Sequence, residues 1–214
     1  MPSIVSIVGI SKSGKTALIE KLIMELKSRH YRVATVKHAP EGTTFDEPDK
    51  DSWRHLQAGS EATVLGSEKG TVLIKPITSE TILDEIARLL GEDYDIILAE
   101  GFKQGDAPKI EVHRKAAGPP LKDIKKLIAI ATDEPLATKT RQFSLDNIKG
   151  LADFIEEGFI RPGGDRLSLY VNDAPIPLSS FPREFVANVL IAMVNSLKGV
   201  GKINSLKVFL KKRE

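Results

Sequence analysis

The sequence predicts an α/β fold: a mostly parallel central sheet flanked by helices, followed by a small α+β C-terminal appendage. Three observations support this prediction. Short β-branched runs alternate with helical segments through the first 157 residues. A glycine-rich turn separates the first strand from the first helix. Three glycines and a proline change the composition at residues 158–165. We therefore expect a domain over residues 1–157, a linker over 158–165 and an extension over 166–214.

Apolar spacing and turn residues define the elements of the first domain. Residues 96–99 are apolar throughout, which is typical of a buried central strand. Residues 109–114 alternate, which predicts a half-exposed strand. The polar segment 38–50 is too long for a simple turn, and we expect a functional loop there. The expected strands are 3–8, 31–37, 61–65, 71–74, 96–99, 109–114 and 127–131, and the expected helices are 16–29, 51–58, 79–90 and 147–156.

The extension is expected to form strands at 167–171, 175–178 and 205–210 and a helix at 181–197. A unit of roughly fifty residues would barely be stable alone. We therefore expect it to dock on the first domain or on a second subunit.

Composition limits the class of protein. Charged residues make up 28% and hydrophobic residues 41% of the 214 residues, which is typical of a globular protein. The net charge of +2 creates no strong field for a polyanion. The absence of cysteine excludes disulfides and thiolate zinc sites, and it suits a reducing compartment. No signal peptide or membrane span is evident, so we expect a cytoplasmic protein.

Residues 9–16 read Gly-Ile-Ser-Lys-Ser-Gly-Lys-Thr and fit the phosphate-binding P-loop pattern G-x-x-x-x-G-K-[ST]. The preceding strand and following helix are the context that this motif requires. Backbone N–H groups of the loop and of the helix N-terminus would surround a triphosphate. Lys15 would reach the β- and γ-phosphates, and the Thr16 hydroxyl would ligate Mg²⁺. The phosphate-binding residues predicted from the motif are Gly9, Ser11, Lys12, Ser13, Gly14, Lys15 and Thr16.

The strand over residues 96–99 has an acid at each end. Ligands of open α/β sheets bind at the carboxyl ends of the strands. At ~3.3 Å per residue, Asp95 and Glu100 lie roughly 16 Å apart, so only Glu100 is at the correct edge. Glu100 could hold Mg²⁺ or orient the attacking water, and we name it with Lys15 as catalytic. Asp95 is expected to be a turn residue.

The same edge rule places Lys37 at the carboxyl end of the second strand, where the 38–50 loop begins. An acid of this loop could complete the Mg²⁺ shell. We assign Asp46 to the metal set with Thr16 and Glu100, and Asp49 and Asp51 stay open as alternatives. Lys50 could neutralise phosphate charge.

These motifs resemble the MobB family, the adaptor proteins of molybdopterin-guanine dinucleotide biosynthesis. The resemblance covers residues 1 to about 155. One departure is Ala39-Pro40-Glu41-Gly42, where family members often carry further histidines. The blocks that carry the resemblance are residues 9–16, Thr35-Val36-Lys37-His38, Lys50-Asp51-Ser52-Trp53-Arg54 with Ala58-Gly59, Glu100-Gly101-Phe102-Lys103 and Lys109-Ile110-Glu111-Val112.

The resemblance implies a GTP-binding, often dimeric P-loop protein with slow GTP hydrolysis. It also implies a partner, the MobA-type guanylyltransferase that joins GMP to molybdopterin. On this basis Gly101 and Lys103 belong with Glu100 to a second nucleotide-side motif, and Lys50 belongs to a segment that lines the site. Asp133 follows a buried strand and could bind guanine, although no N-K-x-D motif is present.

Three other functions stay open. A GTPase metallochaperone is disfavoured because cysteine is absent and His30, His38, His55 and His113 are scattered. A small-molecule kinase is disfavoured because the arginines form no recognisable lid cluster. A nucleic-acid binder that uses the basic C-terminal tail is disfavoured because the net charge of the chain is only +2.

Overall fold

We analysed a computed structural model that describes residues 2–39, 43, 46–76, 82–160, 167–172 and 174–210. The chain forms two compact units, Met1–Arg161 and Pro162–Glu214. We describe each unit by itself. None of the described helices is both long enough and apolar enough to span a membrane.

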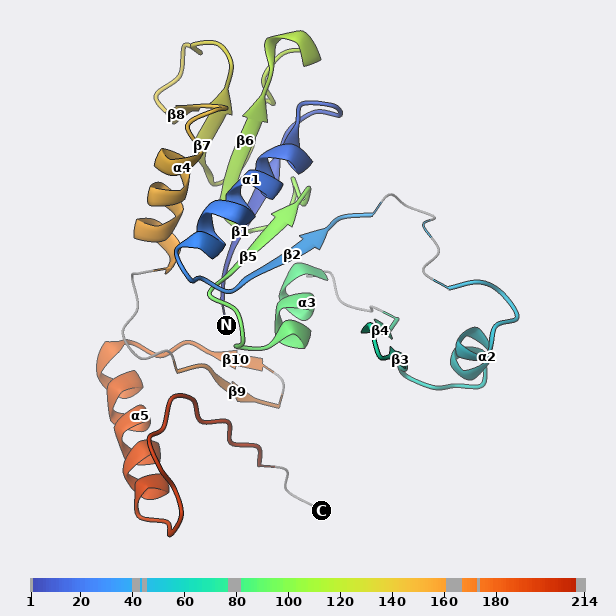
Figure 1. Cartoon of the computed structure of the whole chain (residues 1–214), viewed down its shortest axis with the longest axis vertical. Coiled ribbons are helices and arrows are strands. Elements are labelled where there is room, and N and C mark those ends of the chain that lie inside the picture. The colour runs from blue at the N-terminus through green and yellow to red at the C-terminus, as the bar shows by residue number, and fades with distance from the viewer. Residues whose placement is uncertain are drawn as a thin grey trace. The chain divides into compact units, whose positions relative to one another are not determined.

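A six-stranded sheet forms the centre of the first unit, with the strand order β2-β5-β1-β6-β7-β8 (Figure 1). All of its strand pairs are parallel, which confirms the predicted sheet. The short strand β8 was not predicted because it offers only one buried apolar residue, Phe143. The strands are β1 (Ser3–Val8), β2 (Val33–Lys37), β5 (Ile96–Glu100), β6 (Lys109–His113), β7 (Leu127–Thr132) and β8 (Arg141–Ser144).

Helices cover the two faces of the sheet. On one face, α1 (Lys15–Ser28) and α4 (Ile148–Ile155) share a hydrophobic core with Ile96 and Leu98 of β5. On the other, α3 (Ile82–Leu90) packs against Ile97 and Ala99. Because neighbouring residues of a strand point to opposite faces, the two cores lie on opposite sides of β5. A π-helical turn, η2 (Glu156–Ile160), continues α4 directly.

The segment between β2 and α3 forms its own small structure. Helix α2 (Asp51–Gln57) precedes an antiparallel hairpin of β3 (Thr63–Ser67) and β4 (Gly70–Ile74). The sequence predicted all three elements. Lys50 occupies the N-cap position of α2, and Asp51 is the first residue of the helix. Of the predicted 38–50 loop, residues 40–42, 44 and 45 lie outside the described residues.

The prediction of a half-exposed strand at 109–114 was wrong, because all five residues of β6 are buried. Both β5 and β6 pair with β1. Glu100, the last residue of β5, pairs with Ile7, and Lys109, the first residue of β6, pairs with Ser6. β6 therefore begins at about the level where β5 ends. Residues 101–108 can link the two strands without the dozen or more residues that a parallel connection usually takes. The shift also carries the end of β6 past β1, alongside residues 9–14.

The second unit contains an antiparallel hairpin, β9 (Leu169–Val171) with β10 (Ala174–Ile176), and the helix α5 (Ser180–Asn195). The predicted strand at 205–210 was wrong: residues 205–210 have no regular structure. Phe209 and Leu210 are 91% and 87% exposed, so this apolar run has no sheet to join. Of the expected linker, 158–160 belong to η2 and the rest lies outside the described residues, so the domain limits remain a proposal.

Candidate functional site

The loop between β1 and α1 makes a tight turn. A Cβ atom on Gly9 would lie 2.6 Å from both the Ser13 Oγ and the Val112 carbonyl oxygen, so no side chain fits there. Gly14 precedes the first residue of α1 with a φ of 97°, a left-handed conformation that favours glycine. Lys12 also has a positive φ, 62°. Ser11 and Lys12 are exposed at the tip of the loop.

Lys15 lies folded back over this loop. Its Nζ donates hydrogen bonds to the carbonyl oxygens of Gly9 (3.3 Å) and Ile10 (2.8 Å). Burial lowers the pKa of Lys15, Glu100 opposes this shift, and the charges of Lys103 and Lys37 lower the pKa further. The charges of Lys103 and Lys37 therefore act on Lys15 at this edge of the sheet. Their positive charges favour an anionic ligand at the loop.

Glu100 lies against the first turn of α1. Strands β5 and β1 are neighbours, and the Thr16 hydroxyl lies 3.1 Å from each of the two carboxylate oxygens of Glu100. A hydroxyl and a carboxylate are oxygen ligands of the kind that Mg²⁺ binds, with waters completing its shell. This pair therefore fits a Mg²⁺ ion. Asp95 lies at the opposite end of β5, where its Oδ2 accepts a hydrogen bond from the Arg32 backbone N–H (2.8 Å).

The turn after Glu100 is fixed by close packing on His38. Gly101 has a φ of 97°, and a Cβ atom on it would lie 2.9 Å from the His38 Cβ. The His38 N–H donates to the Glu100 carbonyl (2.9 Å), and the Gly101 N–H donates to the Ile7 carbonyl (3.0 Å). The rings of His38 and Phe102 meet edge to face at 5.0 Å. These contacts explain why a glycine follows Glu100, and they hold this turn at the ends of β1 and β2.

The polar residues of β6 hold two of the loops around the site. The buried Lys109 donates from Nζ to the carbonyl oxygens of Gly105 and Ala107, and burial lowers its pKa. The buried Glu111 accepts a hydrogen bond from the Leu121 N–H at 2.7 Å. Lys109 thus fastens the connection after β5, and Glu111 fastens the connection after β6.

A third polar residue of β6 holds the loop after β7. The buried His113 lies with its Nε2 3.0 Å from Glu134 Oε1. The hydrogen bond with His113 lowers the pKa of Glu134, and the charge of Lys115 lowers it further. Sequence reasoning missed these roles because an alternating polar pattern usually indicates a solvent-exposed face.

Arg114, the residue after β6, was not among the predicted site residues. Its Nε donates a hydrogen bond to the Ser13 carbonyl oxygen at 3.1 Å, and its guanidinium covers the position of a Cβ atom on Gly14. In a trans peptide the C=O and N–H point in opposite directions. Arg114 therefore turns the Gly14 N–H toward the other side of the loop. Its place after a strand was the signal that could have revealed it.

Three other predicted site residues make local contacts. Lys50 pairs with Glu47 at 3.4 Å, and Asp46 accepts a hydrogen bond from the Ser52 hydroxyl at 3.0 Å. Asp133 accepts a hydrogen bond from the Lys115 N–H at 2.9 Å. Within the described part of the chain, none of these contacts reaches the P-loop. Their roles stay predictions.

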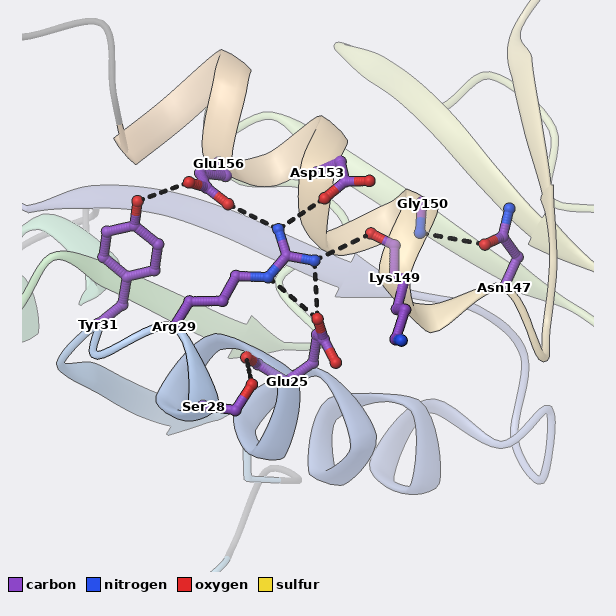
Figure 2. Close-up of polar contacts among 9 residues, drawn as sticks. All are labelled: Glu25, Ser28, Arg29, Tyr31, Asn147, Lys149, Gly150, Asp153 and Glu156. Atoms are coloured by element: carbon purple, nitrogen blue, oxygen red, sulfur yellow. Dashed lines mark hydrogen bonds and ion pairs between the residues drawn. The ribbon is translucent and has the colours of Figure 1, made fainter.

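The far end of α1 is anchored by a charged network (Figure 2). Arg29 donates to Asp153 and Glu156, both at 2.6 Å, and to Glu25 at 2.7 Å. The Tyr31 hydroxyl donates to the other oxygen of Glu156 at 2.7 Å. The hydrogen bond with Glu156 is the main cause of a raised pKa of Arg29. The network fastens α1, whose first turn carries Lys15 and Thr16, to α4 and η2.

Comparisons with known proteins show the family to which the chain belongs. Residues 4–133 match the model of the family "MobB: Molybdopterin guanine dinucleotide synthesis protein B". The molybdopterin-guanine dinucleotide biosynthesis adapter protein of Haemophilus influenzae is 38% identical over 158 residues, which cover 72% of this chain and 87% of that protein. A protein of Methanocaldococcus jannaschii named for the same adapter role is 26% identical over 96% of both chains. The match with that protein therefore extends into the second unit of this chain.

A solved structure shows the same fold. The crystal structure of a molybdopterin-guanine biosynthesis protein B (mobB) superposes with a TM-score of 0.57 at 30% sequence identity. The match covers 72% of this chain and 98% of the solved chain.

Proposed function

This chain belongs to the MobB family, and we propose that it is an adapter of molybdopterin-guanine dinucleotide biosynthesis that binds GTP and Mg²⁺ at its P-loop. The family match supports the adapter role. The observation that carries the nucleotide proposal is the meeting of Lys15, Thr16 and Glu100 at one edge of the sheet.

In this proposal the loop N–H groups hold the phosphates, and Lys15 exchanges its two carbonyl partners for phosphate oxygens. Thr16 and Glu100 hold Mg²⁺, which when bound offsets the charge of the β- and γ-phosphates. Arg114 keeps the Gly14 N–H directed at the ligand. Lys37 and Lys103 offset the remaining negative charge.

The finer parts of the proposal concern turnover and assembly. We propose that GTP hydrolysis is slow, that the chain forms a homodimer in the cytoplasm, and that a MobA-type guanylyltransferase is its partner. Glu100 would orient the attacking water, Asp133 would contact the guanine, and Asp46 and Lys50 would approach the phosphates from the 38–50 loop.

The test is a titration of the full chain with GTP and with ATP, each with and without Mg²⁺. We expect Mg²⁺-dependent binding that Lys15→Ala abolishes and that Arg32→Ala leaves unchanged. Arg32 is a suitable control because it is an exposed arginine at the opposite edge of the sheet. The titration is then repeated with the cognate guanylyltransferase present. If Lys15→Ala bound GTP as tightly as the wild type, the P-loop assignment would be rejected. ATP-dependent phosphorylation of a pterin or nucleotide acceptor would favour the alternative of a small-molecule kinase.

A further inference from the structure

His38 is an exposed histidine that is held at the carboxyl edge of the sheet by three contacts. It directly follows β2, and its backbone N–H donates to the Glu100 carbonyl oxygen at 2.9 Å. A Cβ atom on Gly101 would lie 2.9 Å from the His38 Cβ, and the rings of His38 and Phe102 meet edge to face at 5.0 Å. Exposed side chains usually change rotamer freely. Three successive residues at the end of β5 thus fix one imidazole that the proposed function does not use.

We propose that the His38 imidazole donates a hydrogen bond to the γ-phosphate of bound GTP, so that the site prefers GTP to GDP. The inference rests on the proposed function, because it requires the triphosphate to bind at the P-loop. An imidazole has an N–H donor in both of its protonation states. A phosphate oxygen is a charged acceptor, and hydrogen bonds to charged groups are the strong ones.

The order of the strands favours the γ-phosphate as the group that His38 contacts. The P-loop follows β1, β5 is the neighbour of β1, and β2 is the neighbour of β5 (Figure 1). Glu100 ends β5 and lies against Thr16, so the proposed Mg²⁺ site is on this side of the loop. In P-loop proteins Mg²⁺ bridges the β- and γ-phosphates. The γ-phosphate is therefore expected near the end of β2, where His38 is held.

The opposite side of the P-loop carries the groups expected to contact the rest of the nucleotide. Arg114 follows β6, and Asp133, the residue proposed to contact guanine, follows β7. Three strands separate β2 from β7 in the sheet. At ~4.8 Å between neighbouring strands, the ends of β2 and β7 lie roughly 19 Å apart. This distance is too long for His38 to contact the guanine, which leaves the phosphate end of the ligand.

A hydrogen bond from His38 differs in its effect from the lysine charges at the same edge. The charges of Lys37 and Lys103 act on Lys15. Such charges attract every phosphate, because Coulomb attraction falls slowly with distance. A hydrogen bond needs a donor–acceptor distance of about 2.7–3.2 Å. A fixed imidazole can therefore distinguish a triphosphate from a diphosphate.

A transition-metal site is a less suitable role for His38. Such sites combine several imidazole, thiolate or carboxylate ligands. Among the residues that the structure describes, no three His, Cys, Asp or Glu side chains come together to hold one ion. The contact of the ring with Phe102 also takes up one of its sides.

The first experiment measures the affinities of the full chain for GDP and for a β,γ-imido analogue of GTP, in Mg²⁺ at constant ionic strength. His38→Phe keeps a ring beside Phe102 but has no N–H donor. We expect it to bind the analogue about tenfold more weakly, the effect of one hydrogen bond to a charged group, and to bind GDP within about twofold of the wild type. His55→Phe is the matched control, because His55 is an exposed histidine of α2, and it should change neither affinity.

Two amide variants test whether the N–H group of His38 is what the ligand contacts. The side-chain amides of His38→Asn and His38→Gln place an N–H donor near the positions of Nδ1 and Nε2. We expect one of the two variants to recover part of the preference for the analogue over GDP. The hydrogen bond would be refuted if His38→Phe kept the wild-type preference, if it lost affinity for both nucleotides by the same factor, or if neither amide variant recovered any preference.

A double-mutant cycle tests whether Phe102 positions the His38 ring. Phe102→Leu removes the edge-to-face contact and should lower the preference for the analogue about twofold when His38 is present. In the His38→Phe background, Phe102→Leu should cause no further loss. An equal loss in both backgrounds would show that Phe102 acts without His38 and would overturn the positioning.

The same titrations separate this inference from the proposed function. If the wild type binds neither GDP nor the analogue, the nucleotide proposal fails, and the inference fails with it. If the wild type binds both nucleotides and His38→Phe binds them in the wild-type ratio, only the inference fails.

Discussion

Replacing Arg114 tests whether the P-loop depends on a residue outside its own motif. Arg114 donates one hydrogen bond to the Ser13 carbonyl at 3.1 Å, and its guanidinium lies over Gly14. A hydrogen bond from a charged group contributes about 1.5–3 kcal/mol. Because Arg114 is exposed, we take the lower end of that range. A loss of about 1.5 kcal/mol weakens binding about tenfold.

The assay is a titration of GTP in Mg²⁺ at constant ionic strength for Arg114→Ala, Arg114→Lys and the control Arg32→Ala. We expect both Arg114 variants to bind about tenfold more weakly than Arg32→Ala, since lysine keeps the charge but lacks the Nε donor that holds Ser13. Thermal unfolding of each variant checks that the fold is retained. If Arg114→Lys bound like the wild type, charge alone would be sufficient. If Arg114→Ala bound within twofold of Arg32→Ala, the positioning argument would be refuted.

Four further predictions follow from contacts described above. Gly9→Ala should abolish GTP binding, because its Cβ would meet the Val112 carbonyl oxygen at 2.6 Å; measurable binding in the same titration would contradict the steric argument. Glu100→Gln should slow GTP hydrolysis more than it weakens GTP binding, whereas Asp95→Asn should change neither. Single-turnover hydrolysis rates compare the two variants. A large loss of hydrolysis rate in Asp95→Asn would contradict the placement of the functional acid at the Glu100 end of β5. Arg29→Ala should lower the free energy of unfolding by about 3 kcal/mol, since the buried Glu156 loses its ion pair with Arg29; urea denaturation measures this, and a change below about 1 kcal/mol would show that the network contributes little. Glu134→Gln should make stability depend less on pH in the acid range. The folded pKa of Glu134 lies below its unfolded value of 4.5, so the stabilisation is complete above that value and is lost as the pH falls through the folded pKa. If Glu134→Gln and the wild type showed identical curves of stability against pH, the interaction of Glu134 with His113 would make no contribution to stability.

Much of the fold could be predicted because local signals agreed with one another. Residues 3–29 combined a β-branched strand, a glycine loop and a helical apolar pattern, and all three elements are present. The apolar run that ends at Glu100 is a central strand, and its neighbour is β1. The strands, the helices and the turn between β3 and β4 needed only the spacing of apolar and turn residues, whereas the order of the strands in the sheet was not predicted.

The errors came from residues whose environment is decided by distant parts of the chain. The alternation in β6 predicted a solvated face, but Lys109, Glu111 and His113 are buried and bind the connections after β5, β6 and β7. The apolar run at 205–210 predicted a strand, but a strand requires a partner edge that no local pattern can specify. Arg114 lacks a motif, so only the assembled sheet shows that it touches Ser13.

The fastening of three loops by a single strand has a consequence for how the site unfolds. Lys109, Glu111 and His113 each hold a different connection, so separating β6 from the sheet would release all three connections at once. The edge of the sheet that surrounds the P-loop would then open as one cooperative unit. The amide hydrogens of these connections, that of Leu121 among them, would exchange with solvent at a common rate set by β6.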